Sequence, residues 1–80
     1  MRESYLPIRH PGTLKKVILD EASASLLYFG VAAPGALTSA DVWQIQKIVI
    51  GPGNSVAITW ADGNAEFDNV WDNRASLSYS

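Results

Sequence analysis

The sequence predicts an all-β fold: a small antiparallel β-sandwich or barrel with one short helical turn near residues 67–72 and an extended N-terminal arm. The first observation is that turn-forming sequences recur along the 80 residues, at HPG (10–12), APG (33–35), GPGN (51–54) and ADGN (61–64). Such spacing is typical of short strands joined by tight turns. The second observation is that the segments between these turns alternate apolar and polar residues, which is the period of a strand.

Residues 42–60 carry the clearest pattern, that of a hairpin. In SVAITW the apolar residues Val56, Ile58 and Trp60 alternate with small or polar ones. In the preceding VWQIQKIVI, alternation places Trp43 on one face and Gln44 on the other. GPGN has hairpin length, so we expect the two runs to pair antiparallel. We further expect Trp43 and Trp60 to face the same interior.

The remaining segments complete a single domain over residues 14–80. ASLLYFGVA (24–32) is rich in aromatic and branched residues and predicts a strand buried on both faces. LKKVILD (14–20) is compatible with another strand, although its pattern is short. Phe67, Val70 and Trp71 have i, i+3, i+4 spacing, which predicts the helical turn before a final short strand in ASLSYS. Residues 1–13 have two prolines and little periodicity, so we expect them to form the arm.

Composition narrows the classes of function. The chain has no Cys and one His, and its formal net charge is −2. Its Lys and Arg residues are scattered, so no direct nucleic-acid binding is expected. No apolar run is long enough to span a membrane, and the N-terminus lacks the apolar stretch of a signal peptide. We therefore expect synthesis in the cytoplasm. A small domain without disulfides often gains stability by association, so a homo-oligomer is expected.

The acidic segment 62–68 invites comparison with a calcium loop, because Asp62, Asn64, Glu66 and Asp68 alternate. The pattern departs where that loop needs Gly and Glu, since Phe67 and Asn73 occupy the sixth and twelfth positions. The stronger interpretation is a structural turn at Asp62, Gly63 and Asn64, with Gly63 at positive φ. No metal ligand is assigned, although a weak Ca²⁺ site at 62–68 stays open.

No pattern in the sequence assigns a catalytic residue or a cofactor. His10 lies between Arg9 and Pro11 in the arm, and no feature of the sequence would hold it beside a serine. Asp68 and Asp72 have i, i+4 spacing, but on a solvated turn they are more often exposed charges, with Arg74 close by to neutralise them. We predict that the protein is not an enzyme.

The three tryptophans allow two interpretations, a stacking surface for sugars or bases and a set of core residues. The core interpretation is favoured, because large aromatic side chains dominate burial in small domains. Among the three, Trp71 is assigned to a partner interface, together with Tyr5, Leu6 and Ile8 of the arm, which has apolar residues but no strand period.

YFGVAAPGALTSADVWQIQKIVI, followed by ITWADGNAEFDNVWDNRASLSYS, resembles a family of short proteins encoded by tailed bacteriophages. The resemblance covers residues 28–79 and lies above all in the WADGNxxFDNxWDxRxSLxY motif. It implies a phage origin and a non-catalytic structural role in the virion, as a capsid decoration, neck, tail or fibre component assembled in the host cytoplasm. Other virion proteins are then the expected partners. The alternative is a soluble phage-encoded module that recognises carbohydrate or a host protein through exposed aromatics.

Overall fold

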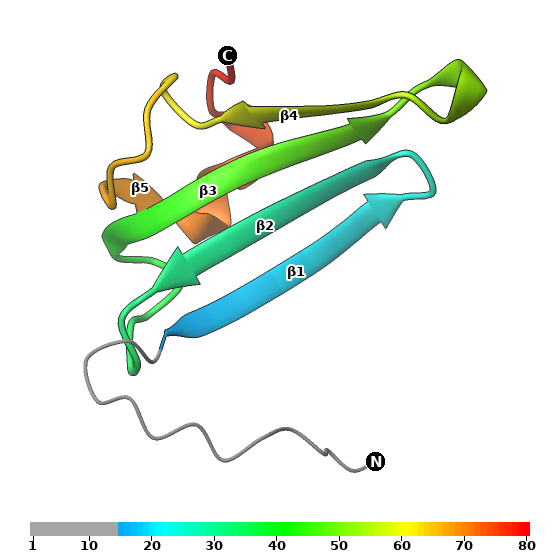
Figure 1. Cartoon of the computed structure of the whole chain (residues 1–80). Coiled ribbons are helices and arrows are strands. Elements are labelled where there is room, and N and C mark those ends of the chain that lie inside the picture. The colour runs from blue at the N-terminus through cyan, green and yellow to red at the C-terminus, as the bar shows by residue number, and fades with distance from the viewer. Residues whose placement is uncertain (1–14) are drawn as a thin grey trace, which may run out of the picture.

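The computed structural model describes residues 15–80, which form one antiparallel β-sheet (Figure 1). Its strands lie side by side in chain order: β1 (Lys16–Ser23), β2 (Leu26–Ala32), β3 (Asp41–Ile50) and β4 (Val56–Trp60). A two-residue strand, β5 (Asn69–Val70), pairs with the start of β3. Every strand pair is antiparallel, so the predicted all-β, antiparallel class is confirmed, and in the described residues it takes the form of a single sheet. The predicted arm, with Tyr5, Leu6 and Ile8, lies outside the described residues.

The β3–β4 hairpin forms as the alternation predicts. Ile48 pairs with Ile58 at its centre, and Lys47 pairs with Thr59. The connection contains a short 3₁₀ helix, η1 (Pro52–Asn54), in which Gly53 has a φ of 71°. The Gly51 N–H donates to the Ser55 carbonyl at 2.7 Å and closes the turn. A positive φ is inexpensive for glycine, which explains a GPGN sequence at this place.

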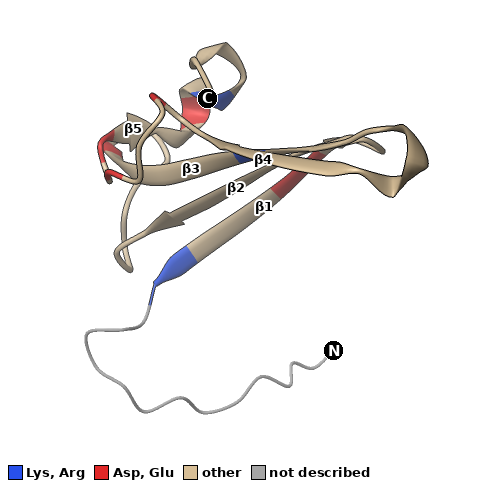
Figure 2. Cartoon of the chain, turned by 45° about the horizontal axis from the view of Figure 1, so that its top comes forward, with Lys and Arg blue, Asp and Glu red and all other residues tan. Residues whose placement is uncertain are grey.

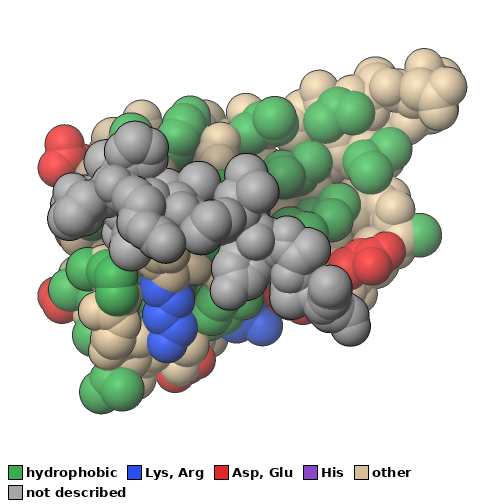
Figure 3. Space-filling view, turned by 60° about the horizontal axis from the view of Figure 1, so that its bottom comes forward, with side chains coloured by type: hydrophobic (Ala, Val, Ile, Leu, Met, Phe, Trp, Pro, Cys, Tyr) green, Lys and Arg blue, Asp and Glu red, His purple; other side chains and the backbone are tan. Residues whose placement is uncertain are grey.

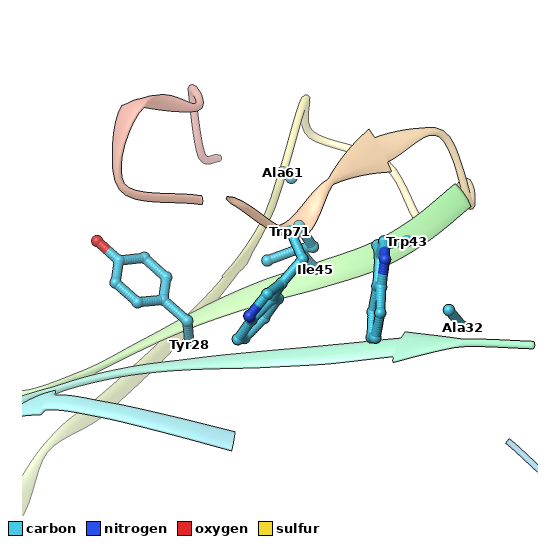
Figure 4. Packing of buried hydrophobic residues seen from close by; sticks show 6 residues of the cluster. All are labelled: Tyr28, Ala32, Trp43, Ile45, Ala61 and Trp71. Atoms are coloured by element: carbon cyan, nitrogen blue, oxygen red, sulfur yellow. The ribbon is translucent and has the colours of Figure 1, made fainter. Parts of the chain in front are cut away.

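One face of the sheet is covered and holds the core of the domain. Six buried residues form this core: Tyr28, Ala32, Trp43, Ile45, Ala61 and Trp71 (Figure 4). The rings of Trp43 and Trp71 are tilted against each other, with centroids 5.7 Å apart. Trp71 begins a second 3₁₀ helix, η2 (Trp71–Ser76), which lies over this face together with β5. We call this side of the sheet the covered face.

The end of the chain returns to the sheet and continues it beyond β4. The Trp60 N–H donates to the Ser80 carbonyl, and the Ser80 N–H donates to the Trp60 carbonyl, at 3.0 and 3.1 Å. Ala61 forms an isolated bridge with Tyr79. Residues 77–80 thus pair with the backbone that precedes the Asp62 turn. The expected final strand in ASLSYS forms only in part, because Ala75 and Ser76 belong to η2 and Tyr79 contributes an isolated bridge.

The helical turn lies later in the chain than its predicted position of 67–72, because it spans Trp71–Ser76. The reason is that Asn69 and Val70 pair with β3, and Val70 keeps an extended backbone with φ −99° and ψ 120°. A helical turn can begin only where this pairing ends. The i, i+4 spacing of Phe67 and Trp71 therefore does not mark a helical face, and Phe67 is exposed while Trp71 is buried.

Trp60 corrects a second prediction, since it does not share the interior with Trp43. Trp60 pairs with Gln46. Paired residues of an antiparallel sheet lie on the same face, and Gln46 is three positions from Trp43, so it lies on the opposite face. Trp43 is fully buried on the covered face, whereas Trp60 is half-buried on the other side.

Candidate functional site

The face of the sheet opposite the core is apolar over most of its area. Strand alternation identifies its side chains on β2 and β3, where they lie between the buried positions, and the pairing register extends the assignment to β1 and β4. The apolar members are Val17, Leu19, Leu27, Phe29, Val31, Val42, Ile48, Ile50, Val56, Ile58 and Trp60. We call this surface, formed by strands β1–β4, the open face.

Large aliphatic residues of the open face are strongly exposed at both edges of the sheet. Val17 and Leu19 on β1 are 54% and 58% exposed, and Val56 and Ile58 on β4 are 57% and 54% exposed. Figure 3 shows hydrophobic side chains gathered over this side of the sheet. Single exposed hydrophobic residues are ordinary, whereas contiguous sets of them are typical of surfaces that contact other molecules.

Charged side chains avoid this surface. Among the strand residues that alternate onto the open face, Glu21 near the end of β1 is the one with a charge. Figure 2 shows most of the charges of the described region near strand ends and in the segment after β4. The other polar groups of the open face include Gln44 and Gln46, in the middle of β3. The centre of the open face is therefore uncharged.

The acidic segment 62–68 forms a turn, as predicted. Gly63 has a φ of 72° and Asp62 a φ of 59°, so both central residues are in the left-handed region, as a tight hairpin-type turn requires. The Asn64 side chain accepts from the Glu66 N–H at 2.9 Å and donates to the Asp62 carbonyl at 3.4 Å. Asn64 is thereby engaged within the loop itself. Across residues 15–80, no group of three or more Asp, Glu, His or Cys residues is placed to hold a metal ion.

Arg74 corrects the expectation that it neutralises Asp68 and Asp72. Its Nε donates to the Asp20 carboxylate on β1 at 2.9 Å, and its Nη1 donates to the Trp71 carbonyl at 3.1 Å. The guanidinium also lies 4.6 Å from the centre of the Trp71 ring. These contacts attach η2 to the far edge of the sheet, so the role of Arg74 is to hold the cover on the core.

Tyr79 forms the other attachment of the C-terminal segment. Its hydroxyl donates to the Arg74 carbonyl at 2.7 Å, and its ring lies 6.0 Å from that of Tyr28. Burial, followed by the neighbouring Tyr28, raises the pKa of Tyr79 from 10.0 to about 12. The phenol therefore stays protonated in the folded protein at neutral pH and acts as a structural donor.

Burial also overturns the assignment of Trp71 to a partner interface. Trp71 is 4% exposed, and its ring is enclosed by Trp43, Gly30 and Arg74. Trp43 is fully buried as well, so the three tryptophans do not form a common stacking surface. The aromatic residues left with accessible area include Trp60 on the open face and Phe67, which is 44% exposed and has the Lys15 ammonium 5.4 Å from its ring centre.

Comparison with known proteins found no match: no family model, curated protein or solved structure matches the chain. In the part of the chain that the structure describes, no helix is long and apolar enough to cross a membrane.

The open face was not recognised from the sequence, although a signal for it was present. The run LLYFGVA has large apolar residues at both parities, which predicts burial on both sides of β2. In β4, the alternation of Val56, Ile58 and Trp60 with small or polar residues predicts one inward-facing side, but it does not identify that side. Within residues 15–80, η2, β5 and residues 77–80 cover one face of the sheet, and these residues place no cover over the second apolar face.

Proposed function

We propose that this protein is a non-catalytic structural component of a bacteriophage particle, and that it acts by docking its open face on another protein surface. The observation that carries the proposal is the apolar, uncharged surface across β1–β4. Such a surface on a chain of 80 residues is a large part of what the domain presents to its surroundings. Covering it with protein would contribute the burial that a small core cannot supply alone.

The polar groups of the described region support a structural role. Arg74, Asp20 and Tyr79 are engaged in holding η2 on the sheet, and Asn64 is engaged in shaping its own turn. These contacts use the hydrogen-bonding groups of the four side chains within the fold, so none of the four is directed toward a substrate. A reaction would need a nucleophile, acid or base directed into a common space.

The phage context of the proposal rests on the resemblance of residues 28–79 to short proteins of tailed phages. In the structure, the residues of the motif that carries this resemblance stabilise the fold. The WADGN segment turns the chain after β4, Asn69 pairs β5 with β3, and Trp71, Arg74 and Tyr79 close the covered face. We infer that the motif specifies the fold, and that the open face supplies the contact with other virion proteins.

The proposal is tested by quantifying the chain in purified phage particles. Particles from a host that carries the gene are banded on a density gradient, and the protein is measured by mass spectrometry against the major capsid protein. We expect a constant ratio between preparations, because the copy number of a structural component is set by particle symmetry. Absence of the chain from banded particles would contradict the proposal.

A pair of variants links incorporation to the open face. Ile58→Lys places a charge on the open face, whereas Leu37→Lys makes the same kind of change at an exposed residue between β2 and β3. We expect particles to lose the Ile58→Lys protein and retain the Leu37→Lys protein. Equal incorporation of both would show that the chain docks through another surface.

A further inference from the structure

We propose that the open face packs against the open face of a second copy of this chain, so that two sheets form a face-to-face β-sandwich dimer. The inference rests on the proposed function in one respect, that the open face is the surface of contact. It adds the identity of the partner and the geometry of the complex. The two sheets would lie about 10 Å apart with their strands within about 30° of each other. The twofold axis would run between the sheets, which makes the interface isologous.

The first argument is that the open face is complementary to itself. Most of its central positions are aliphatic or aromatic, including Phe29 on β2 and Ile48 on β3, and the polar residue among them, Gln46, is uncharged. Opposing two copies therefore brings apolar side chains against apolar side chains. Glu21 lies near the end of β1, at the margin of the surface, where it can stay hydrated. Two such faces can approach without burying an unpaired charge, which would otherwise oppose association.

The second argument is the size of the surface. Four strands at a spacing of about 4.8 Å, each with about seven residues at a rise of about 3.3 Å, make a face of roughly 19 by 23 Å. Each copy then offers more than roughly 400 Å² before the relief of the side chains is counted. A pair of faces has roughly 900 Å² of flat area, and the relief of the side chains brings this to about the 1,000 Å² that a specific interface should exceed. A second copy therefore matches the area that needs to be covered.

The third argument compares the sequence of residues 1–14 with the composition of the open face. This segment contains the charged residues Arg2, Glu3 and Arg9 between its apolar ones, whereas Glu21 is the one charged strand residue of the open face. A partner surface without charges matches the open face better, and the β4 edge offers Val56 and Ile58, both more than half exposed, to such a partner.

Sedimentation equilibrium of the full-length chain tests the inference. Over roughly 1 to 100 μM protein we expect a reversible monomer–dimer equilibrium. Leu19→Lys and Ile58→Lys each change a residue that is more than half exposed, so the fold of the protomer should survive, as far-UV circular dichroism will check. Each should raise the dimer dissociation constant by about tenfold or more, because a lysine is then desolvated at the interface. Leu37→Lys, at a residue 69% exposed in a loop, should leave it unchanged.

Three results would overturn the inference: a full-length chain that stays monomeric, a dimer that tolerates both open-face lysines, and a larger oligomer. The first would mean that residues 1–14 or a different protein covers the face. A monomer that is nonetheless present in purified particles would refute the paired sheets and leave the virion role standing. A lysine-sensitive dimer that is absent from particles would refute the virion role and leave the pairing standing.

Discussion

Gly30 on β2 offers the sharpest test of the core, because the ring of Trp71 lies directly against its backbone. A Cβ placed on Gly30 would lie 2.5 Å from both Cε3 and Cζ3 of Trp71, and 3.1 Å from Cε3 of Trp43. Carbon atoms in good contact are about 3.5 to 4.0 Å apart, so the first contact is short by at least about 1 Å. The glycine thus allows the cover of the sheet to approach closely.

The magnitude of the Gly30→Ala effect follows from what would have to move. Trp71 is held between the Trp43 ring and the guanidinium of Arg74, so its indole cannot shift alone. Overpacking a core by a methyl group costs about 1–3 kcal/mol, and two rigid rings place this case in the upper half of that range. In a strand without such a neighbour, alanine would instead stabilise by about 0.4–1 kcal/mol through the unfolded chain. The predicted sign therefore depends on the Trp71 contact.

Thermal unfolding followed by far-UV circular dichroism measures this effect at a fixed protein concentration, since association would also change the midpoint. A loss of about 2 kcal/mol should lower the midpoint by roughly 8–16 °C for a domain of this size. In a Trp71→Leu background, which removes the ring, the same alanine should cost much less. A Gly30→Ala protein as stable as the parent, or more stable, would refute the packing of Trp71 on β2.

Three further changes test the turn and the attachments of the C-terminal segment. Gly63→Val should lower the unfolding free energy by about 1 kcal/mol or more, because Gly63 has a φ of 72° and a β-branched residue resists that conformation; unchanged urea denaturation would argue against the turn. Arg74→Lys should cost about 1 kcal/mol, since lysine cannot reproduce the contacts with both Asp20 and Trp71, and a double-mutant cycle with Asp20→Asn should show the coupling. For Tyr79, the folded pKa of about 12 exceeds the ordinary 10.0, so its contribution to stability is complete below pH 10 and is lost as the pH rises through about 12. As the pH is raised through this range, the unfolding free energy of the parent should therefore fall more steeply than that of Tyr79→Phe. Parallel curves for the two proteins would contradict the burial of this phenol.

Local patterns were sufficient to predict most of the sheet. Strands β2, β3 and β4, the hairpin between β3 and β4, and the left-handed backbone at Gly63 all depend on residues close together in the sequence. Turn chemistry and a period of two report directly on such features. For the same reason, even the short LKKVILD pattern was compatible with a strand, and it forms most of β1.

The features that the sequence did not reveal depend on contacts between distant segments. Arg74 meets Asp20 across 54 positions, and no local pattern marks that pair. The position of η2 was predicted too early because β5 pairs with β3 and keeps Val70 extended. Whether Trp60 faces the interior depends on the register with Gln46 and on which side receives the C-terminal segment. Alternation separates two faces of a strand, but it does not say which one the rest of the chain will cover.

The distribution of aromatic side chains connects the fold to the proposed assembly. Four aromatic side chains pack on the covered face: Tyr28, Trp43, Trp71 and Tyr79. The segments that lie over this face, η2 and residues 77–80, together have about ten residues. Such a short segment can reach across one side of the sheet only. The second side of the sheet also carries Val, Leu, Ile and Phe, with Glu21 as its one charged strand residue, and the described residues 15–80 place no second layer over it. In a two-layer β architecture that missing layer is another sheet, and a second copy of the same chain supplies one with the same width, twist and apolar pattern.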